Sequence, residues 1–202
     1  MDTYRNFEEL ARNEQEGRDY VILYREMGSA VAIMAPHGGG IEPGTLDIAD
    51  ALAGSDFSFY ALNSIKGSGG GRLHLTSNGF DEPIGLEVAG RAAVVVTIHG
   101  NRNEGELVFI GGRNNALKKN ICQALNMAGF RAEISDLPGL RGISRNNICN
   151  RGKNGEGVQL EISRGLRKKM FENFCRQSIR KKNHIFQLFV DTIKKVLLSV
   201  SI

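Results

Sequence analysis

Three side chains that are good metal ligands follow two apolar, strand-like segments of the sequence. His37 and Glu42 lie in the glycine-rich run His-Gly-Gly-Gly-Ile-Glu, and His99 closes a second apolar, β-branched run over 92–99. Two imidazoles and one carboxylate, with a short first spacer and a long second one, are typical of a catalytic zinc site that keeps one position open for water. We therefore expect His37, Glu42 and His99 to bind zinc.

The glycine-rich run between an expected strand (31–35) and an expected helix (45–53) has other interpretations. Such a segment can bind phosphate, but this one lacks the G-x-G-x-x-G spacing and the Gly-Lys-Ser/Thr ending of phosphate loops. It can also be only a turn, with an incidental His and Glu. The glycines permit positive φ angles and remove the Cβ atoms that would keep the backbone away from an ion or substrate.

A fourth polar side chain lies on another expected strand. Over 158–163 apolar and polar residues alternate, so Glu161 lies on the face opposite Val158, Leu160 and Ile162. Glu161 lies near the carboxyl end of this expected strand. In open α/β sheets ligands gather at the carboxyl ends of the strands. A carboxylate there can act as the general base of a metal-assisted hydrolysis. The alternative is an exposed strand glutamate without function.

Strands and helices alternate along the chain. This order predicts an α/β fold, a single domain over 1–202 with a mostly parallel twisted sheet flanked by helices. The apolar periodicity of the last helix predicts a face that packs in the core. The aperiodic stretch 136–157 is interpreted as a substrate loop, and the glycine-rich stretch 67–71 as a flexible loop near the cleft. The other predicted strands are 20–24, 57–62, 106–110 and 130–134, and the other predicted helices are 114–127 and 185–199.

Composition indicates an ordinary globular chain. Hydrophobic residues make up 41% of it and charged residues 24%, and no apolar run is long enough to cross a membrane. The first ten residues lack an apolar signal-peptide core, so we expect a cytoplasmic protein, for which cell lysis is one route of release. Three widely spaced cysteines predict reduced thiols rather than a disulfide framework. We expect a monomer without a membrane partner.

Several segments together resemble the phage-type poly-γ-glutamate hydrolase family. The match covers nearly the whole chain and rests on Ala-Pro-His-Gly-Gly-Gly-Ile-Glu-Pro-Gly-Thr (35–45), Leu-His-Leu-Thr-Ser (73–77), Phe-Asp-Glu-Pro (80–83), Ile-His-Gly (98–100) and Gly-Val-Gln-Leu-Glu-Ile-Ser-Arg-Gly-Leu-Arg (157–167). The resemblance implies a zinc carboxypeptidase-like fold, zinc, and cleavage of the γ-amide links of poly-γ-glutamate. It also implies His37, Glu42 and His99 as ligands and Glu161 as the catalytic glutamate. Zinc carboxypeptidases separate His and Glu by two residues, whereas four intervene here.

The charge distribution bears on this polyanionic substrate. Eight basic residues lie in the stretch 164–182 against a single glutamate, a surplus of seven. A positive surface attracts polyanions. It would attract nucleic acid as well, although the stretch lacks the interleaved aromatic residues of single-strand binders, and we do not expect a nucleic-acid partner. An ordinary solvated helix face is the other interpretation.

Individual arginines are candidates for binding substrate carboxylates. Planar guanidinium groups bind carboxylates through two parallel hydrogen bonds. Arg113 follows a predicted strand, Arg151 lies in the long loop, and Arg164 comes three residues after Glu161. His74 lies in a segment shared with the family, and we expect a hydrogen-bonded structural histidine there rather than a ligand.

Two other function classes stay open. A zinc amidase or carboxypeptidase acting on small acylated amino acids or cell-wall peptides would use the same site. A nucleic-acid-associated phage protein would need only the basic stretch.

Overall fold

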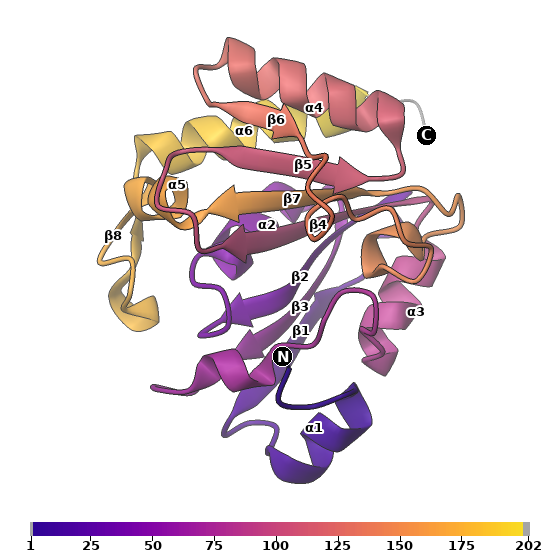
Figure 1. Cartoon of the computed structure of the whole chain (residues 1–202), viewed down its shortest axis with the longest axis vertical. Coiled ribbons are helices and arrows are strands. Elements are labelled where there is room, and N and C mark those ends of the chain that lie inside the picture. The colour runs from indigo at the N-terminus through magenta and orange to yellow at the C-terminus, as the bar shows by residue number, and fades with distance from the viewer. Residues whose placement is uncertain (1, 200–202) are drawn as a thin grey trace.

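A seven-stranded mixed sheet with helices on both faces forms the centre of the molecule (Figure 1). The computed structural model describes residues 2–199. The strands are β1 (Tyr20–Arg25), β2 (Val31–Gly39), β3 (Ser58–Ser64), β4 (Val94–Asn101), β5 (Val108–Gly112), β6 (Ala132–Ile134) and β7 (Val158–Ser163). Their order across the sheet is β1-β3-β2-β4-β7-β5-β6, with antiparallel pairing only for β1–β3 and β5–β7 among these neighbours. The predicted single-domain α/β fold with a mostly parallel sheet is confirmed.

Two apolar clusters hold the helices on the sheet. The helices are α1 (Phe7–Asn13), α2 (Thr45–Ala53), α3 (Pro83–Arg91), α4 (Asn115–Met127), α5 (Arg164–Met170) and α6 (His184–Ser199). Helices α2, α4, α5 and α6 contribute to the larger cluster, on the face of Val158, Leu160 and Ile162. Helices α1 and α3 and the short 3-10 helices η1 (Gly70–Leu73) and η2 (Ile148–Asn150) contribute to the smaller cluster on the opposite face.

The sequence pattern predicts the long elements well and the short ones poorly. Helices α2, α4 and α6 lie where periodicity predicts them, and the apolar face of α6 is packed in the core as expected. Helices α1, α3 and α5 are not predicted, nor are the two-residue strands β8 (Phe171–Glu172) and β9 (Lys181–Lys182), which pair as a hairpin, or the 3-10 helix η3 (Gln177–Ile179) in its loop. Among the described residues, no helix has the length and apolar character needed to span a membrane. All three cysteines are free.

Strand β2 continues into the glycine-rich run and ends at Gly39, although the sequence predicts its end before Pro36. Its pairing with β3 shifts register between Ala35 and Gly38, which marks a bulge, and a proline is tolerated there because the ladder is already interrupted. Gly39 has a φ of +65°, as expected of a glycine turn, and a Cβ atom on it would lie 2.2 Å from the carbonyl oxygen of Ser64. The glycines therefore allow β2 to pack closely on β3, and the bulge redirects the side chain of His37.

Candidate metal centre

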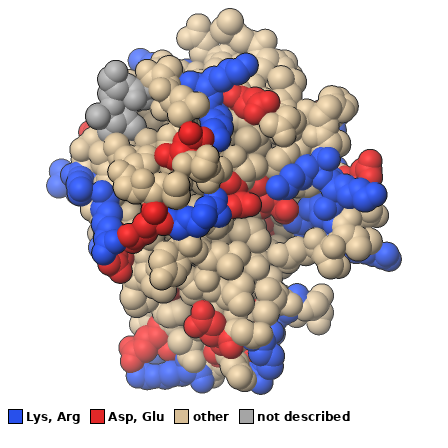
Figure 2. All heavy atoms as spheres, turned by 180° about the vertical axis from the view of Figure 1, so that it is seen from behind, with Lys and Arg blue, Asp and Glu red and all other residues tan. Residues whose placement is uncertain are grey.

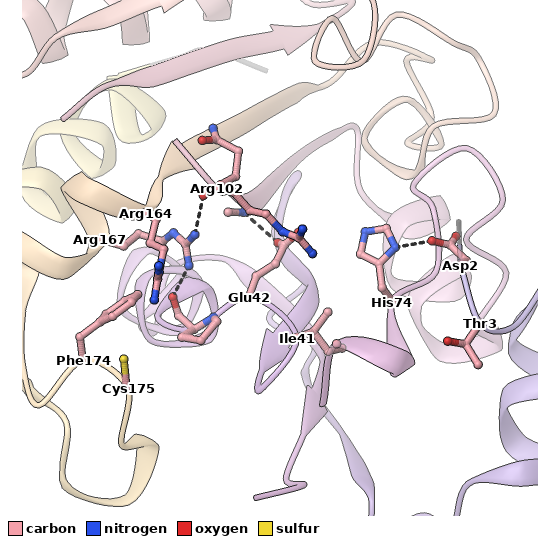
Figure 3. A pocket seen from close by; sticks show the side chains of 14 residues that line it. Asp2, Thr3, Ile41, Glu42, His74, Arg102, Arg164, Arg167, Phe174 and Cys175 are labelled. Atoms are coloured by element: carbon pink, nitrogen blue, oxygen red, sulfur yellow. Dashed lines mark hydrogen bonds and ion pairs between the residues drawn. The ribbon is translucent and has the colours of Figure 1, made fainter. Parts of the chain in front are cut away.

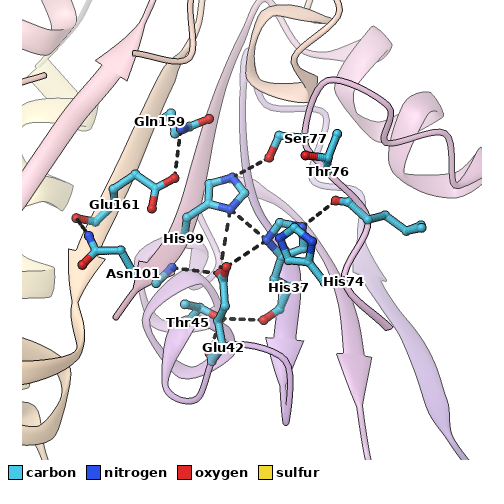
Figure 4. Close-up of polar contacts among 12 residues, drawn as sticks. His37, Glu42, Thr45, His74, Thr76, Ser77, His99, Asn101, Gln159 and Glu161 are labelled. Carbon is cyan, nitrogen blue, oxygen red and sulfur yellow. Dashed lines mark hydrogen bonds and ion pairs between the residues drawn. The ribbon is translucent and has the colours of Figure 1, made fainter. Parts of the chain in front are cut away.

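The predicted ligands come together where parallel strands end. His37 lies in the bulge of β2, Glu42 in the turn that follows, and His99 near the end of β4. Glu161 of β7 pairs with His99 in the register of the sheet, so both side chains project from the same face. Figure 4 shows the Glu161 carboxylate on one side of the His99 ring and the Glu42–His37 pair on the other.

The spacing of the ligand atoms fits one metal ion. The Nδ1 atom of His37 lies 3.1 Å from Nδ1 of His99 and 3.2 Å from Oε1 of Glu42, and His99 Nδ1 lies 3.8 Å from Glu42 Oε2. Ligand atoms bound to a tetrahedral zinc at about 2.0–2.1 Å lie about 3.3 Å from one another. Both histidines are only 2% exposed. The three donors thus enclose a space of the right size for zinc.

The remaining ring nitrogens fix which atom of each histidine faces that space. His37 Nε2 lies 2.8 Å from the carbonyl oxygen of Leu75, and a carbonyl only accepts, so Nε2 carries the proton and Nδ1 holds the lone pair in the neutral ring. His99 Nε2 lies 3.4 Å from the Ser77 hydroxyl. Metal-binding histidines ordinarily have such a partner on the second nitrogen. The short segment 75–77 therefore orients both imidazoles.

Asp2 anchors that segment. One carboxylate oxygen accepts a hydrogen bond from the Thr76 amide at 2.7 Å, and the other lies 2.7 Å from Nδ1 of His74. The ring of His74 lies against His37, with 4.1 Å between ring centroids. His74 is hydrogen-bonded as the sequence predicts, and it also lines the cavities beside the ligands. Sequence reasoning missed Asp2, because a contact across 72 residues leaves no local pattern.

Burial and mutual contacts shift the pKa values of all three candidate ligands. Burial opposes charge on His37, but the carboxylate of Glu42 outweighs it and raises the pKa of His37. Burial lowers the pKa of His99 to about 3, and the neighbouring His37 adds to this effect. Although burial alone would raise it, the pKa of Glu42 falls to about 2, because His37 and the Gly100 amide stabilise its carboxylate. These shifts favour the ionised carboxylate of Glu42 and the neutral ring of His99, the forms that bind metal. The raised pKa of His37 favours its protonated ring, so a metal ion bound there would displace a proton.

Glu161 lies in a different environment. It is 9% exposed, so it is not the exposed strand residue of the alternative interpretation. The side chain of Gln159 donates to Oε1 of Glu161 at 3.0 Å and accepts a hydrogen bond from the side-chain amide of Asn147 at 2.8 Å. These contacts fix the carboxylate. Burial, together with the charge of Glu42, raises the pKa of Glu161 to about 8. A buried carboxyl with a raised pKa beside metal ligands is the usual environment of a proton-transferring residue.

Arg167 holds the loops of the site together. Its guanidinium is buried and donates to the carbonyl oxygens of Pro43, Asn101 and Ile162 at 2.5, 2.8 and 3.1 Å. These carbonyls belong to the loop after Glu42, the end of β4 and the end of β7. A Cβ atom on Gly100 would lie 2.5 Å from the guanidinium carbon, which explains the glycine after His99. The sequence does not predict this role.

Two cavities adjoin the ligands. The smaller, which we call the ligand cavity, has a volume of about 190 Å³ and is lined by His37, His99 and Glu161, and by Gly139 and Asn147 of the long loop. The larger, the arginine cavity, has a volume of about 570 Å³. Its lining includes Glu42 and three arginines, Arg102, Arg164 and Arg167, on the side shown in Figure 3.

The three arginines predicted to bind substrate carboxylates are not gathered at the site. Arg113 follows β5, whose last residue pairs with the first residue of β7, because these strands are antiparallel. Arg151 lies close to the beginning of β4, where the amide of Lys153 donates to the carbonyl of Ala92. Both are therefore displaced toward the far end of the sheet, and neither lines the two cavities. Only Arg164 does, and it is paired with Glu104 at 2.8 Å.

The basic stretch is less positive than its composition suggests. Four of its eight cations form ion pairs, with Glu104 (Arg164 and Lys168), Glu106 (Lys169) and Asp47 (Arg180). Figure 2 shows blue and red side chains side by side along the edge formed by α5 and the β8–β9 hairpin. This mixture weakens the argument for nucleic-acid binding, which needs an unbalanced positive surface.

Comparisons with known sequences identify relatives over most of the chain. A family model described as poly-gamma-glutamate hydrolase matches residues 4–192. The UPF0714 protein YndL of Bacillus subtilis (strain 168) is 38% identical over 88% of this chain and 70% of its own length. The UPF0714 protein YmaC of the same organism is 39% identical over 97% of this chain and 84% of its own length.

Solved structures agree with these matches. A bacteriophage poly-gamma-glutamate hydrolase superposes with a TM-score of 0.94 at 30% identity, covering 98% of this chain and 97% of the other. A structure described as YNDL-apo (Zinc-free) superposes with a TM-score of 0.93 at 36% identity, covering 98% of both chains. An N-formylglutamate amidohydrolase from Ralstonia eutropha, at 10% identity and a TM-score of 0.56 over 90% of this chain and 96% of the other, shares the fold alone.

Proposed function

Since this chain belongs to the poly-γ-glutamate hydrolase family, and is a hydrolase of that kind, we propose that it cleaves the γ-glutamyl amide bonds of poly-γ-glutamate in a zinc-dependent reaction. The observation that carries the zinc assignment is the trio His37, Glu42 and His99, with donor atoms all within 4.8 Å. The zinc-free description of the YndL structure supports zinc for a relative of this chain.

The three donors would hold the ion through two Nδ1 atoms and one carboxylate. When bound, zinc supplies a Lewis acid that polarises the amide carbonyl and acidifies a coordinated water molecule. The hydrogen bonds to Leu75 and Gly100 would keep the His37 and Glu42 donors aimed at the ion.

Glu161 is proposed as the general base. Its carboxylate faces the ligand cavity, where Gln159 fixes one oxygen and leaves the other free. That oxygen takes a proton from the attacking water and passes it to the leaving amide nitrogen. A pKa above that of an ordinary carboxyl suits both proton transfers. A bound cation nearby would lower the pKa of Glu161 from about 8 toward pH 7.

The substrate carboxylates are proposed to be bound in the arginine cavity. Poly-γ-glutamate carries one free carboxylate per residue, so every residue near the scissile bond needs a cationic partner or solvent. Arg102 and Arg164 line this cavity next to Glu42 and Gly100. Charged hydrogen bonds of this kind are about twice as strong as neutral ones.

One experiment tests substrate and metal together. Purified protein is incubated with poly-γ-glutamate, and polymer length is followed by gel filtration with a chelator, without it, and after zinc is restored. We expect shortening that the chelator stops and zinc recovers, and no shortening of α-linked polyglutamate, which has the same charge. Release of single glutamates without loss of polymer length would favour a carboxypeptidase, and an unchanged polymer in all arms would contradict the proposal.

A further inference from the structure

A second large cavity continues the arginine cavity away from the metal ligands. This distal cavity has a volume of about 830 Å³ and lies between the loop before η1 and the loop that closes the β8–β9 hairpin. It shares Pro43 and Cys175 with the arginine cavity. The two cavities are therefore adjacent, and we call the pair, which extends from Glu42 past Cys175, the groove. Figure 3 shows Cys175 at the edge of the arginine cavity.

The charge in the distal cavity has one sign. Its lining includes Lys66, Arg176 and Arg180 and no acidic residue. Lys66 is paired with Glu14, and Arg180 with Asp47, so these two cations are already balanced. Among the contacts of the described residues, the exposed side chain of Arg176 has no hydrogen bond or ion pair, which leaves its guanidinium available for a ligand.

The arginine cavity has the same arrangement. Arg164 is paired with Glu104, and Arg167 donates to three carbonyl oxygens. Arg102 is exposed, and no side-chain contact of Arg102 is found among the described residues. Each half of the groove thus presents one arginine whose charge is not compensated inside the protein.

The wall of the distal cavity suits an extended chain. A third of its lining residues are glycines, at positions 39, 40, 67, 69 and 70, and these parts of the wall carry no side chain that narrows the groove. The glycine-rich loop predicted from the sequence to lie near the cleft is part of this wall. Gly70 is tied to the site by packing, because a Cβ atom on it would lie 2.8 Å from the carbonyl carbon of Gly40.

From these features we propose that the distal cavity is a second carboxylate subsite, in which Arg176 binds a γ-glutamyl residue several positions from the scissile bond. Arg102 binds a carboxylate close to that bond. This inference rests on the proposed function and adds the prediction that the enzyme recognises a long stretch of polymer, not only the bond that it cuts.

Substrates of different length separate the two arginines. Arg102→Gln should lower kcat/KM about tenfold on γ-glutamate oligomers of every length, since it removes a charged hydrogen bond near the cut. Arg176→Gln should give a similar loss, through KM, only on oligomers long enough to reach the distal cavity. Lys181→Gln is the control, because this exposed lysine of β9 lines neither cavity. The proposal would be overturned if Arg176→Gln were as active as wild type on long polymer. It would also be overturned if Arg176→Gln lost the same activity on oligomers of every length.

Cys175 gives a readout that does not depend on cleavage. Its exposed thiol lies between the two cavities, whereas Cys149 is buried. In the Glu161→Gln variant, long poly-γ-glutamate should slow maleimide labelling of Cys175 several-fold, and a short oligomer should not. Unchanged labelling under saturating polymer would refute binding of the polymer along the groove, even if wild type cuts the polymer. Protection of Cys175 without any cleavage by wild type would refute the hydrolase assignment but support binding along the groove.

Discussion

The Nε2 atom of His37 lies 2.8 Å from the carbonyl oxygen of Leu75, and this contact leaves Nδ1 as the atom that faces Glu42 and His99. The carbonyl belongs to a segment without regular secondary structure. Because no helix or sheet hydrogen bonds fix such a segment, its position depends on contacts with other parts of the chain. Asp2 supplies two of them, through the Thr76 amide and the His74 ring. Asp2 therefore supports His37, a candidate metal ligand that follows it by 35 positions.

We predict that Asp2→Ala weakens zinc binding about tenfold, the lower end of the effect seen when an outer-shell partner of a metal ligand is removed. The physical reason is that the Leu75 carbonyl and the Ser77 hydroxyl lose their fixed positions, so the two imidazoles are less well oriented. Competition with a chromophoric chelator measures the affinity directly.

Asp81→Ala is the matched control for this variant. Asp81 also anchors the N-terminal segment, by accepting a hydrogen bond from the Phe7 backbone amide at 2.7 Å. Among the described residues, its side chain has no hydrogen bond or ion pair to the segment that supports the histidines. Equal zinc affinities in the two variants would show that Asp2 acts only through general stability.

For Glu161→Gln we predict a fall in kcat of about 10²–10⁴-fold, the range for loss of a general base, with zinc content unchanged. The amide keeps the shape of the carboxyl group and its contact with Gln159 but cannot accept the proton. Turnover assays and metal analysis of the same preparation test this. Loss of zinc along with activity would instead place Glu161 among the ligands.

The convergence of the candidate site residues could be predicted from the sequence because His37, His99 and Glu161 each lie at or near the end of a strongly apolar strand. Residues at the carboxyl ends of neighbouring parallel strands meet at one edge of a sheet, so His37, His99 and Glu161 needed only correct strand assignments. The same logic fails for Arg113. A pattern of apolar residues does not show strand direction, and the antiparallel pairing of β5 with β7 carries this arginine toward the other end.

The supporting contacts left no signal in the sequence. The partner of His37 is a backbone carbonyl, which every residue has, and the partners of Arg167 are three further carbonyls. Strand β2 shows a similar limit, because Pro36 predicts the end of a strand unless the bulge beside it is known. Short helices such as α1 and α5 depend on packing and caps more than on periodicity, which explains why they were missed.

Gly100→Ala should lower the free energy of unfolding by about 1–3 kcal/mol, as expected for overpacking a closely packed site. The added methyl group would lie 2.5 Å from the guanidinium carbon of Arg167, which three carbonyls hold in place. Gly90→Ala in α3 is the control, since nothing lies within 4 Å of its Cβ position, and it should be neutral or stabilising by about 0.4–1 kcal/mol. Urea unfolding of both variants measures the difference, and equal stabilities would contradict a fixed Arg167.

The stability of the protein should decrease in acid partly through Glu14, a buried carboxylate that pairs with Lys66 of the distal cavity. Lys66 and the Tyr4 hydroxyl, which donates to Glu14 at 2.6 Å, lower the pKa of Glu14 below its ordinary value. A carboxyl whose pKa is lower in the folded state stabilises the protein above its unfolded pKa of about 4.3, and this contribution is lost as pH falls through the folded pKa. Glu14→Gln should therefore lower Tm at pH 7, and the difference from wild type should shrink below about pH 4.

Glu8→Gln, at an exposed position of α1, is the control and should change Tm little at either pH. If the difference in Tm between Glu14→Gln and wild type stayed constant from pH 7 to pH 3, the carboxylate would not be the source of the stabilisation.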